Sequence, residues 1–401
     1  YYLFVILCLI IPGYAVLDLL GLRRKPEIKL CLAIVISIFI YALTATFAYI
    51  FKLDNQLMQV VLLLAIGASI SYFIQKRLYK ELKVMAFPLL AFLVGTVIAS
   101  SFISLSFNHP IQYIPDPEVL SGRNYNTLNV KVLHVAQPPA TDNSVPYRQA
   151  QFYINRMDPA KDSFINEWGV QFFQRTPLLG AVTASFFTIF GDSVPATYSW
   201  SANTSDTDHT YQKFQIIAHI MNTLYILPAF ILIKKLFNKR TAIVSVFFLA
   251  TSHFFLFNAI FSWPKTFVAF FILLSWVLLM NRDKRAIYVA AFVGGLAYLA
   301  HDLSILFIGA SMVYLLFSRR YRDMLIIGGG LILFMIPWLI ASGFVYDKPS
   351  TFPLYPFAVD GLPQLAQGGH AVMDKFFKTP IQEIISIRLD TTFYLLSPYD
   401  L

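Results

Sequence analysis

The chain has 401 residues, of which 57% are hydrophobic and only 13% are charged, and its mean hydropathy is +0.62. A soluble domain carries about a quarter of charged residues. The composition therefore excludes an ordinary cytosolic enzyme, a disordered protein and a nucleic-acid-binding protein, despite a net charge of +9. It predicts an all-α polytopic membrane protein.

Ten segments are apolar enough to cross a bilayer, whose hydrocarbon core requires about 20 residues of helix. In chain order they are 1–20, 30–51, 56–74, 84–106, 213–235, 241–260, 264–281, 286–302, 303–318 and 323–343. A polar segment, 107–212, separates the fourth from the fifth, and a second one, 344–401, contains an amphipathic stretch around 373–389. The first span lacks a basic leader and a small-residue cleavage site, so no cleavable signal peptide is expected.

Basic residues mark one side of the membrane. Five short connectors hold more than half of the 31 Lys and Arg residues: 22–29, 75–83, 234–240, 281–285 and 318–323. Short connectors rich in Lys and Arg stay in the cytoplasm, and all five fall on one side when ten spans alternate. Both ends of the chain and the segment 107–212 are therefore expected outside the cytoplasm.

Several short motifs follow one another from the polar segment onwards. They are ATDNSVPY at 140–147, QRTPLLG at 174–180, LFNKR at 236–240, NAIFSWPK at 258–265 and GGLAYLAHD at 294–302. The apolar run 179–190 is too short to span and suits a helix that lies at the membrane surface.

In this order and with this sidedness, the motifs resemble the membrane glycosyltransferases of the C-type (GT-C) fold, which include aminoarabinose transferases and protein O-mannosyltransferases. The resemblance covers about 84–343. It implies a seven-helix core with the outer loop domain 107–212, preceded by a three-helix addition at 1–83 and followed by an extracytoplasmic segment at 344–401. The sequence Ile11-Pro12-Gly13-Tyr14 resembles the first helix of large bacterial membrane proteins with such cores.

The resemblance also implies an activity. These enzymes take a sugar from a polyprenyl-phosphate donor and transfer it at the outer face of the membrane to a glycan, lipid or protein acceptor. The expected location is a bacterial-type plasma membrane, as part of cell-envelope chemistry. A divalent cation, Mn²⁺ or Mg²⁺, is a possible cofactor.

Asp142 is the candidate catalytic residue. The resemblance gives it the role of acceptor base or metal ligand, and an acceptor hydroxyl does need a carboxylate within hydrogen-bond reach to take its proton. The alternative is an Asx turn, because Thr141, Asp142 and Asn143 precede Pro146.

Three cations are candidates for binding the donor phosphate: Arg175, Lys265 and Arg148. The guanidinium fork of Arg175 suits phosphate, whereas the alternative is a solvated arginine that packs on Trp168. Lys265 stands where many family members carry an acid, which leaves metal dependence open. Its alternative is a snorkelling lysine at a helix start, with Pro264 at the first helical position.

His301 and Asp302 are candidates for a second shell or for metal binding. An ionisable residue inside a span is by default a functional hypothesis, and the alternative is that Asp302 caps the following helix. A further stretch, Asp206 to His209, has a metal-like composition but is interpreted as a solvated loop. Gly328 to Gly330 lie inside a span and are interpreted as helix packing. Cys8 and Cys31 lie in apolar runs and are interpreted as packing or lipid-facing residues.

Two other functions stay open. Lys265 and the Gln174 that precedes Arg175 favour a catalytically degenerate subunit that acts as a scaffold with other membrane subunits. A transporter or channel would carry several polar residues along a path, or paired broken helices. Only Asp18, Asp302, Pro228 and Pro337 point that way.

Overall fold

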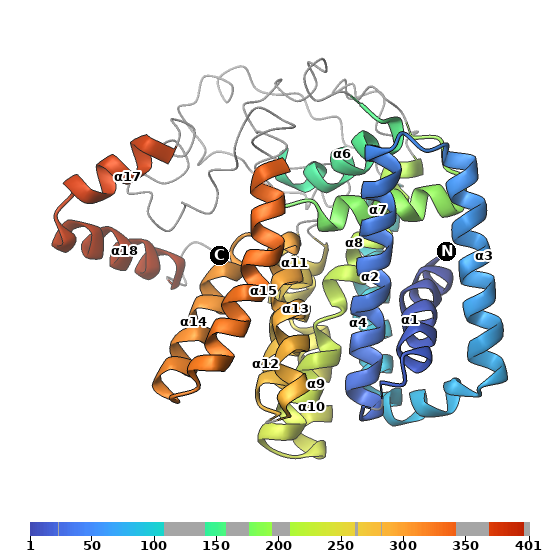
Figure 1. Ribbon diagram of the computed structural model, residues 1–401, viewed down its shortest axis with the longest axis horizontal. Coiled ribbons are helices and arrows are strands. Elements are labelled where there is room, and N and C mark those ends of the chain that lie inside the picture. The colour runs from blue at the N-terminus through green and yellow to red at the C-terminus, as the bar shows by residue number, and fades with distance from the viewer. Residues whose placement is uncertain are drawn as a thin grey trace.

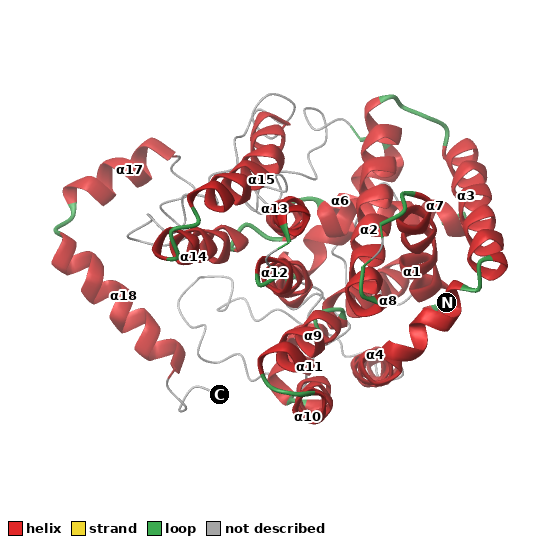
Figure 2. Ribbon diagram, turned by 60° about the horizontal axis from the view of Figure 1, so that its bottom comes forward, coloured by secondary structure: helices red, strands yellow, loops and turns green. Residues whose placement is uncertain are grey.

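The computed structural model describes residues 1–22, 24–107, 141–157, 176–194, 209–260, 264–281, 283–341 and 369–396. The secondary structure in these ranges is helical (Figures 1 and 2), which confirms an all-α polytopic membrane protein. Arg175, Trp168 and the stretch 206–208 lie outside the described residues, as do the side chains of Asp142 and His209.

Six helical stretches in the described part of the chain are long and apolar enough to cross a bilayer. They are α1 (Tyr2–Leu19), α2 (Pro26–Ile50), α3 (Asn55–Gln75), η1 (Leu78–Met85) with α4 (Ala86–Phe107), α8 (His209–Thr223) with α9 (Ile226–Leu236), and α15 (Tyr321–Ile340). A seventh forms if α10 (Lys239–Thr251) and α11 (His253–Ile260), which meet at 55°, count as one span.

The remaining three expected spans are shorter than the sequence suggests. Each is a helix of 14 to 17 residues: α12 (Lys265–Leu279), α13 (Lys284–Ala300) and α14 (Ser304–Phe317). At 1.5 Å per residue, such helices reach about 21–26 Å, less than the hydrocarbon thickness of about 30 Å. Six or seven spans therefore meet the length requirement, and a count of ten remains a prediction.

Helix boundaries follow from local capping. The Asp54 carboxylate accepts hydrogen bonds from the backbone N–H of Gln56 and Leu57 (2.8 and 3.0 Å) at the start of α3. Asn238 and Asp283 cap α10 and α13 in the same way. Such side chains satisfy N–H groups that have no partner inside the helix.

The five basic connectors gather at one end of the bundle, the lower end in Figure 1. Connector 22–29 makes ion pairs with three of the others: Lys29 with Glu81, Glu27 with Lys234, and Arg24 with Asp283. Lys235 donates to Asn281, and Arg320 donates to the carbonyl of Leu279. We call this the basic end.

Asp283 shows how the basic end is held. Its carboxylate accepts from the Arg285 backbone N–H (2.9 Å) and pairs with Arg24, and these two contacts lower the pKa of Asp283 below its usual value. Because Arg24 precedes α2 and Asp283 caps α13, the pair links the N-terminal helices to the later ones.

Asp18 belongs to a polar cluster at the same end. Lys29 donates to Asp18 and to Glu81 at 3.2 Å each, and Tyr72 donates to Asp18 at 3.0 Å. These partners come from α1, α2, α3 and η1, so Asp18 ties helices together. This structural role accounts for one of the polar residues that pointed towards a transporter.

Two helices lie across the other end of the bundle (Figure 1): α6 (Thr141–Asn155) and α7 (Leu178–Phe190). α7 confirms the helix expected at 179–190, and Gly191 ends it with a positive φ of 66°, which favours glycine. Helix α3 anchors this layer, because Asn55 donates to the Ile154 carbonyl and Gln59 to the Ile189 carbonyl.

The amphipathic stretch expected around 373–389 forms α17 (Gly369–Lys378) and α18 (Ile381–Leu396). Both helices lie to the side of the bundle (Figures 1 and 2). Cys8 and Cys31 are buried, which fits packing and not lipid exposure.

The positions of the connectors give a topology prediction. With Cys8 and Cys31 replaced, single cysteines in place of Lys80, Lys239 and Lys284 should react only with reagents that enter the cytoplasm. A cysteine in place of the exposed Lys52, in the α2–α3 connector, is the control and should react from outside. Outside labelling at any of the first three positions would contradict this orientation.

Candidate functional site

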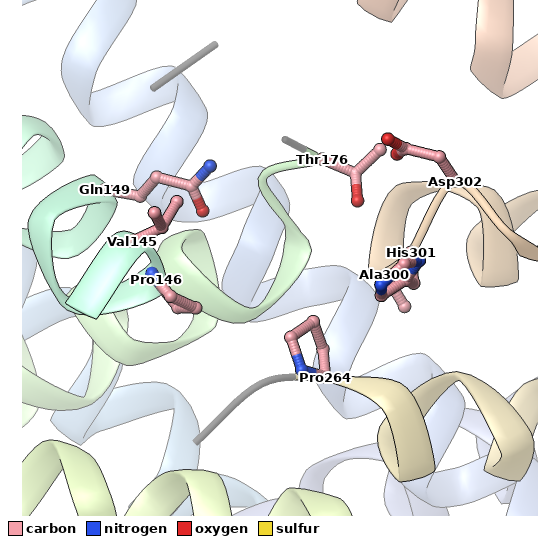
Figure 3. Close-up of a pocket in the computed structure, with 8 residues that line it drawn as sticks. All are labelled: Val145, Pro146, Gln149, Thr176, Pro264, Ala300, His301 and Asp302. Atoms are coloured by element: carbon pink, nitrogen blue, oxygen red, sulfur yellow. The ribbon is translucent and has the colours of Figure 1, made fainter. Parts of the chain in front are cut away.

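A pocket lies between α6 and the turns that precede α7 and α12 and follow α13 (Figure 3). It is a small hollow at the surface: about 270 Å³ there is not filled by atoms, a volume that includes open solvent. The described residues that line it are Val145, Pro146, Gln149, Thr176, Pro264, Ala300, His301 and Asp302. Four motif segments far apart in the sequence thus meet: α6, the turn at Thr176 before α7, and the two outer turns at Pro264 and at His301 and Asp302.

Helix α6 carries the catalytic candidate in its first turn and also lines this pocket. Positions 142, 145, 146 and 149 are spaced i, i+3, i+4 and i+7, so they share one face of the helix. Val145, Pro146 and Gln149 on that face line the pocket. Residue 142 lies in the first helical turn, so its backbone belongs to α6 and not to an isolated turn before it.

His301 and Asp302 line the opposite wall. Both are buried, at 5% and 4% exposure, and the Asp302 carboxylate lies at the top of the pocket near Thr176 in Figure 3. The residue that caps α14 is Leu303, without a side-chain capping bond. Asp302 precedes this N-cap residue, and its carbonyl oxygen accepts from the backbone N–H of Ile305 in the first turn of α14.

The His301 ring has a defined tautomer. The backbone N–H of Leu303 donates to His301 Nδ1 at 3.2 Å. Because an amide N–H can only donate, Nδ1 is the unprotonated nitrogen and a neutral ring carries its proton on Nε2. His301 would lose this hydrogen bond if it offered a bare Nε2 to a metal ion, so it fits a hydrogen-bond donor better than a ligand.

Two of the candidate phosphate-binding cations, Lys265 and Arg175, are neighbours in sequence of residues that line the pocket. Lys265 is exposed and is the first residue of α12, directly after Pro264. Pro264 takes the N-cap position, one residue earlier than the first helical position that the sequence suggested. Arg175 lies outside the described residues and immediately precedes the pocket residue Thr176.

Arg148 is placed differently. It is buried in α6, one residue before Gln149, and it is not among the described residues that line the pocket. The structure thus brings the segments that carry Asp142, Lys265, His301 and Asp302 together at the pocket, and the role of Arg148, which lies on one of these segments, stays a prediction.

Gln149 and Thr176 were not singled out from the sequence. The helical spacing from Asp142 to Gln149 is the signal that could have identified Gln149, and the neighbouring Arg175 could have identified Thr176.

In the described part of the chain, no group of three or more His, Cys, Asp and Glu side chains is placed to hold a metal ion.

Residues 174–340 match the family model described as dolichyl-phosphate-mannose-protein mannosyltransferase. This part of the chain is similar to membrane glycosyltransferases. The matched range begins two residues before Thr176 and contains Pro264, His301 and Asp302, so it includes most of the pocket wall. The match supports the GT-C resemblance and glycosyltransferase activity. No curated protein and no solved structure matches the chain.

Proposed function

We propose that the protein transfers a sugar from a polyprenyl-phosphate donor to an acceptor at the outer face of the membrane, and that the pocket is where transfer occurs. The observation that carries the proposal is the shared face of α6. Position 142 shares this face with Val145, Pro146 and Gln149, which line the pocket together with the buried pair His301 and Asp302.

The chemistry needs three contributions. The Asp142 carboxylate takes the proton of the acceptor hydroxyl. The acceptor oxygen attacks the anomeric carbon from the face opposite the phosphate, the bond between that carbon and the phosphate oxygen breaks, and polyprenyl phosphate leaves with the electron pair. Arg175 and Lys265 stabilise the charge that develops on this phosphate. Attack from the opposite face inverts the anomeric centre.

The pocket's position fits a lipid-linked donor. It lies at the end of the bundle that carries α6 and α7, opposite the basic end (Figure 1). An acceptor can reach a sugar-phosphate head group bound there while the polyprenyl tail of the donor stays in the bilayer.

Phosphate binding by side chains gives a prediction for Lys265. Lys265→Ala should lower the transfer rate by about 10²–10³-fold, as is typical for the loss of one charge-stabilising donor, while a chelator leaves the wild-type rate nearly unchanged. Lys375→Ala, at a lysine of α17 outside the pocket, is the control. A rate that a chelator abolishes and Mn²⁺ or Mg²⁺ restores, with Lys265→Ala nearly silent, would instead assign the phosphate to a metal ion held by Asp142 and Asp302.

The proposal is tested with the chain in proteoliposomes that contain a membrane extract as acceptor. Undecaprenyl phosphate carrying a radiolabelled hexose or aminoarabinose is supplied, and label transfer and release of undecaprenyl phosphate are followed. Label transfer that occurs only when the protein is present supports the proposed glycosyltransferase activity. Tight association with other membrane proteins and no turnover of any donor would favour the scaffold subunit.

A further inference from the structure

Two buried side chains of α8 contact the end of α11 and the first turn of α12, on either side of Pro264 and Lys265. His219 Nε2 lies 3.1 Å from the carbonyl oxygen of Ile260, the last residue of α11. One turn along α8, Asn222 Oδ1 accepts a hydrogen bond of 3.1 Å from the backbone N–H of Phe267, in the first turn of α12. The two contacts flank the segment from 261 to 266.

These contacts satisfy backbone groups at the end of α11 and at the start of α12. The carbonyl of Ile260 ends α11, and the Phe267 N–H belongs to the first turn of α12, where N–H groups have no partner in the helix. Pro264 occupies the N-cap position and makes no side-chain capping bond. Asn222 supplies that cap from a neighbouring helix.

The ring of His219 acts through a single tautomer. A carbonyl oxygen only accepts, so Nε2–H donates to Ile260 and Nδ1 is unprotonated. His219 and Asn222 are spaced i, i+3 and therefore share a face of α8. Thr223 beside them makes a 2.7 Å hydrogen bond with Thr96, which fixes α8 against α4.

Backbone groups inside a bilayer must find partners within the protein, because no water replaces a lost hydrogen bond there. His219 and Asn222 are both fully buried. Polar side chains at such positions are costly unless they bind a specific group, and here each binds a backbone group at one end of the same turn.

We infer that His219 and Asn222 are positioning residues, which hold the α11–α12 turn so that Lys265 stays at the edge of the pocket. The role in transfer rests on the proposed function, whereas the role in holding the turn does not. A displacement of about 1 Å in a positioned group costs on the order of 10²-fold in rate, so loss of either contact should lower kcat more than it changes KM.

The test measures the turn and the reaction separately. A nitroxide attached to Lys265→Cys, with Cys8 and Cys31 replaced, reports mobility by electron paramagnetic resonance in nanodiscs. Asn222→Leu and His219→Leu should each increase that mobility. Asn222→Asp and His219→Gln, which keep the acceptor and the donor, should not, and neither should Thr223→Val. In the Lys265 background, kcat for undecaprenyl-phosphate mannose should fall about 10–100-fold in the two Leu variants and recover in the conservative ones.

The outcomes separate the two proposals. Unchanged label mobility in both Leu variants overturns the inference, whatever the activity. Increased mobility without turnover by any variant or by the wild type supports the positioning role and contradicts the proposed function. If Asn222→Leu does not fold, His219→Leu tests the same turn from its other end. A mobile label in Asn222→Asp and His219→Gln as well would show that a general loss of packing, and not these hydrogen bonds, is responsible.

Discussion

Asp142→Asn should lower sugar transfer by about 10²–10⁴-fold, the range typical of removing a general base. The substitution keeps the size of the side chain and its place in the first turn of α6, but an amide does not take the acceptor proton. Binding of the donor should change little, because phosphate contacts are assigned to Arg175 and Lys265. Initial rates and KM for the donor in proteoliposomes measure both effects.

Asp374→Asn is the matched control for this experiment. Asp374 lies on α17, is exposed and pairs with Lys378 one turn away, outside the pocket. Its variant should transfer sugar at the wild-type rate. If Asp142→Asn is active while Asp302→Asn is not, the base lies on the α13 side of the pocket and the assignment to α6 is wrong.

Gly330→Ala should lower the free energy of unfolding by about 1–3 kcal/mol, the usual cost of overpacking. A Cβ at Gly330 would lie 2.4 Å from the carbonyl oxygen of Ala291 and 2.8 Å from its Cβ, so α15 could not stay so close to α13. Gly295 is equally tight, because a Cβ there would lie 2.4 Å from the Gly330 carbonyl oxygen. Since α13 leads into His301 and Asp302, a displaced α13 would also disturb the pocket.

The adjacent glycine gives an internal control. A Cβ at Gly329 meets nothing within 4 Å, so Gly329→Ala should be neutral or slightly stabilising, because alanine favours helix more than glycine does. The melting temperatures of the two variants in the same detergent provide the comparison. Equal melting temperatures would contradict the close α13–α15 contact.

The sequence predicted features that depend on local signals. The apolar run 179–190 became α7 within one residue, because a short hydrophobic segment before Gly191 is a local pattern. The basic connectors met at one end, because the clustering of Lys and Arg reports topology directly. The interpretation of Gly328 to Gly330 as helix packing holds best for Gly330, where the neighbouring backbone is closest.

Other features depend on contacts that no local pattern shows. The bend between α10 and α11 occurs at Ser252, which is extended at φ −65° and ψ 132°, although no proline or glycine marks it. The short lengths of α12 to α14 and the approach of Gln149 to Pro264 and His301 arise from packing between distant segments. The capping of α12 by Asn222 joins residues 45 positions apart.

A density map of the protein in nanodiscs with a non-hydrolysable polyprenyl-phosphate sugar tests the central claim most directly. The account predicts a head group in the pocket bounded by Gln149, Thr176 and Asp302, with its phosphate beside Lys265 and its tail running along the bundle into the bilayer. A saturated sample with an empty pocket, or with the head group bound at the basic end, would contradict it.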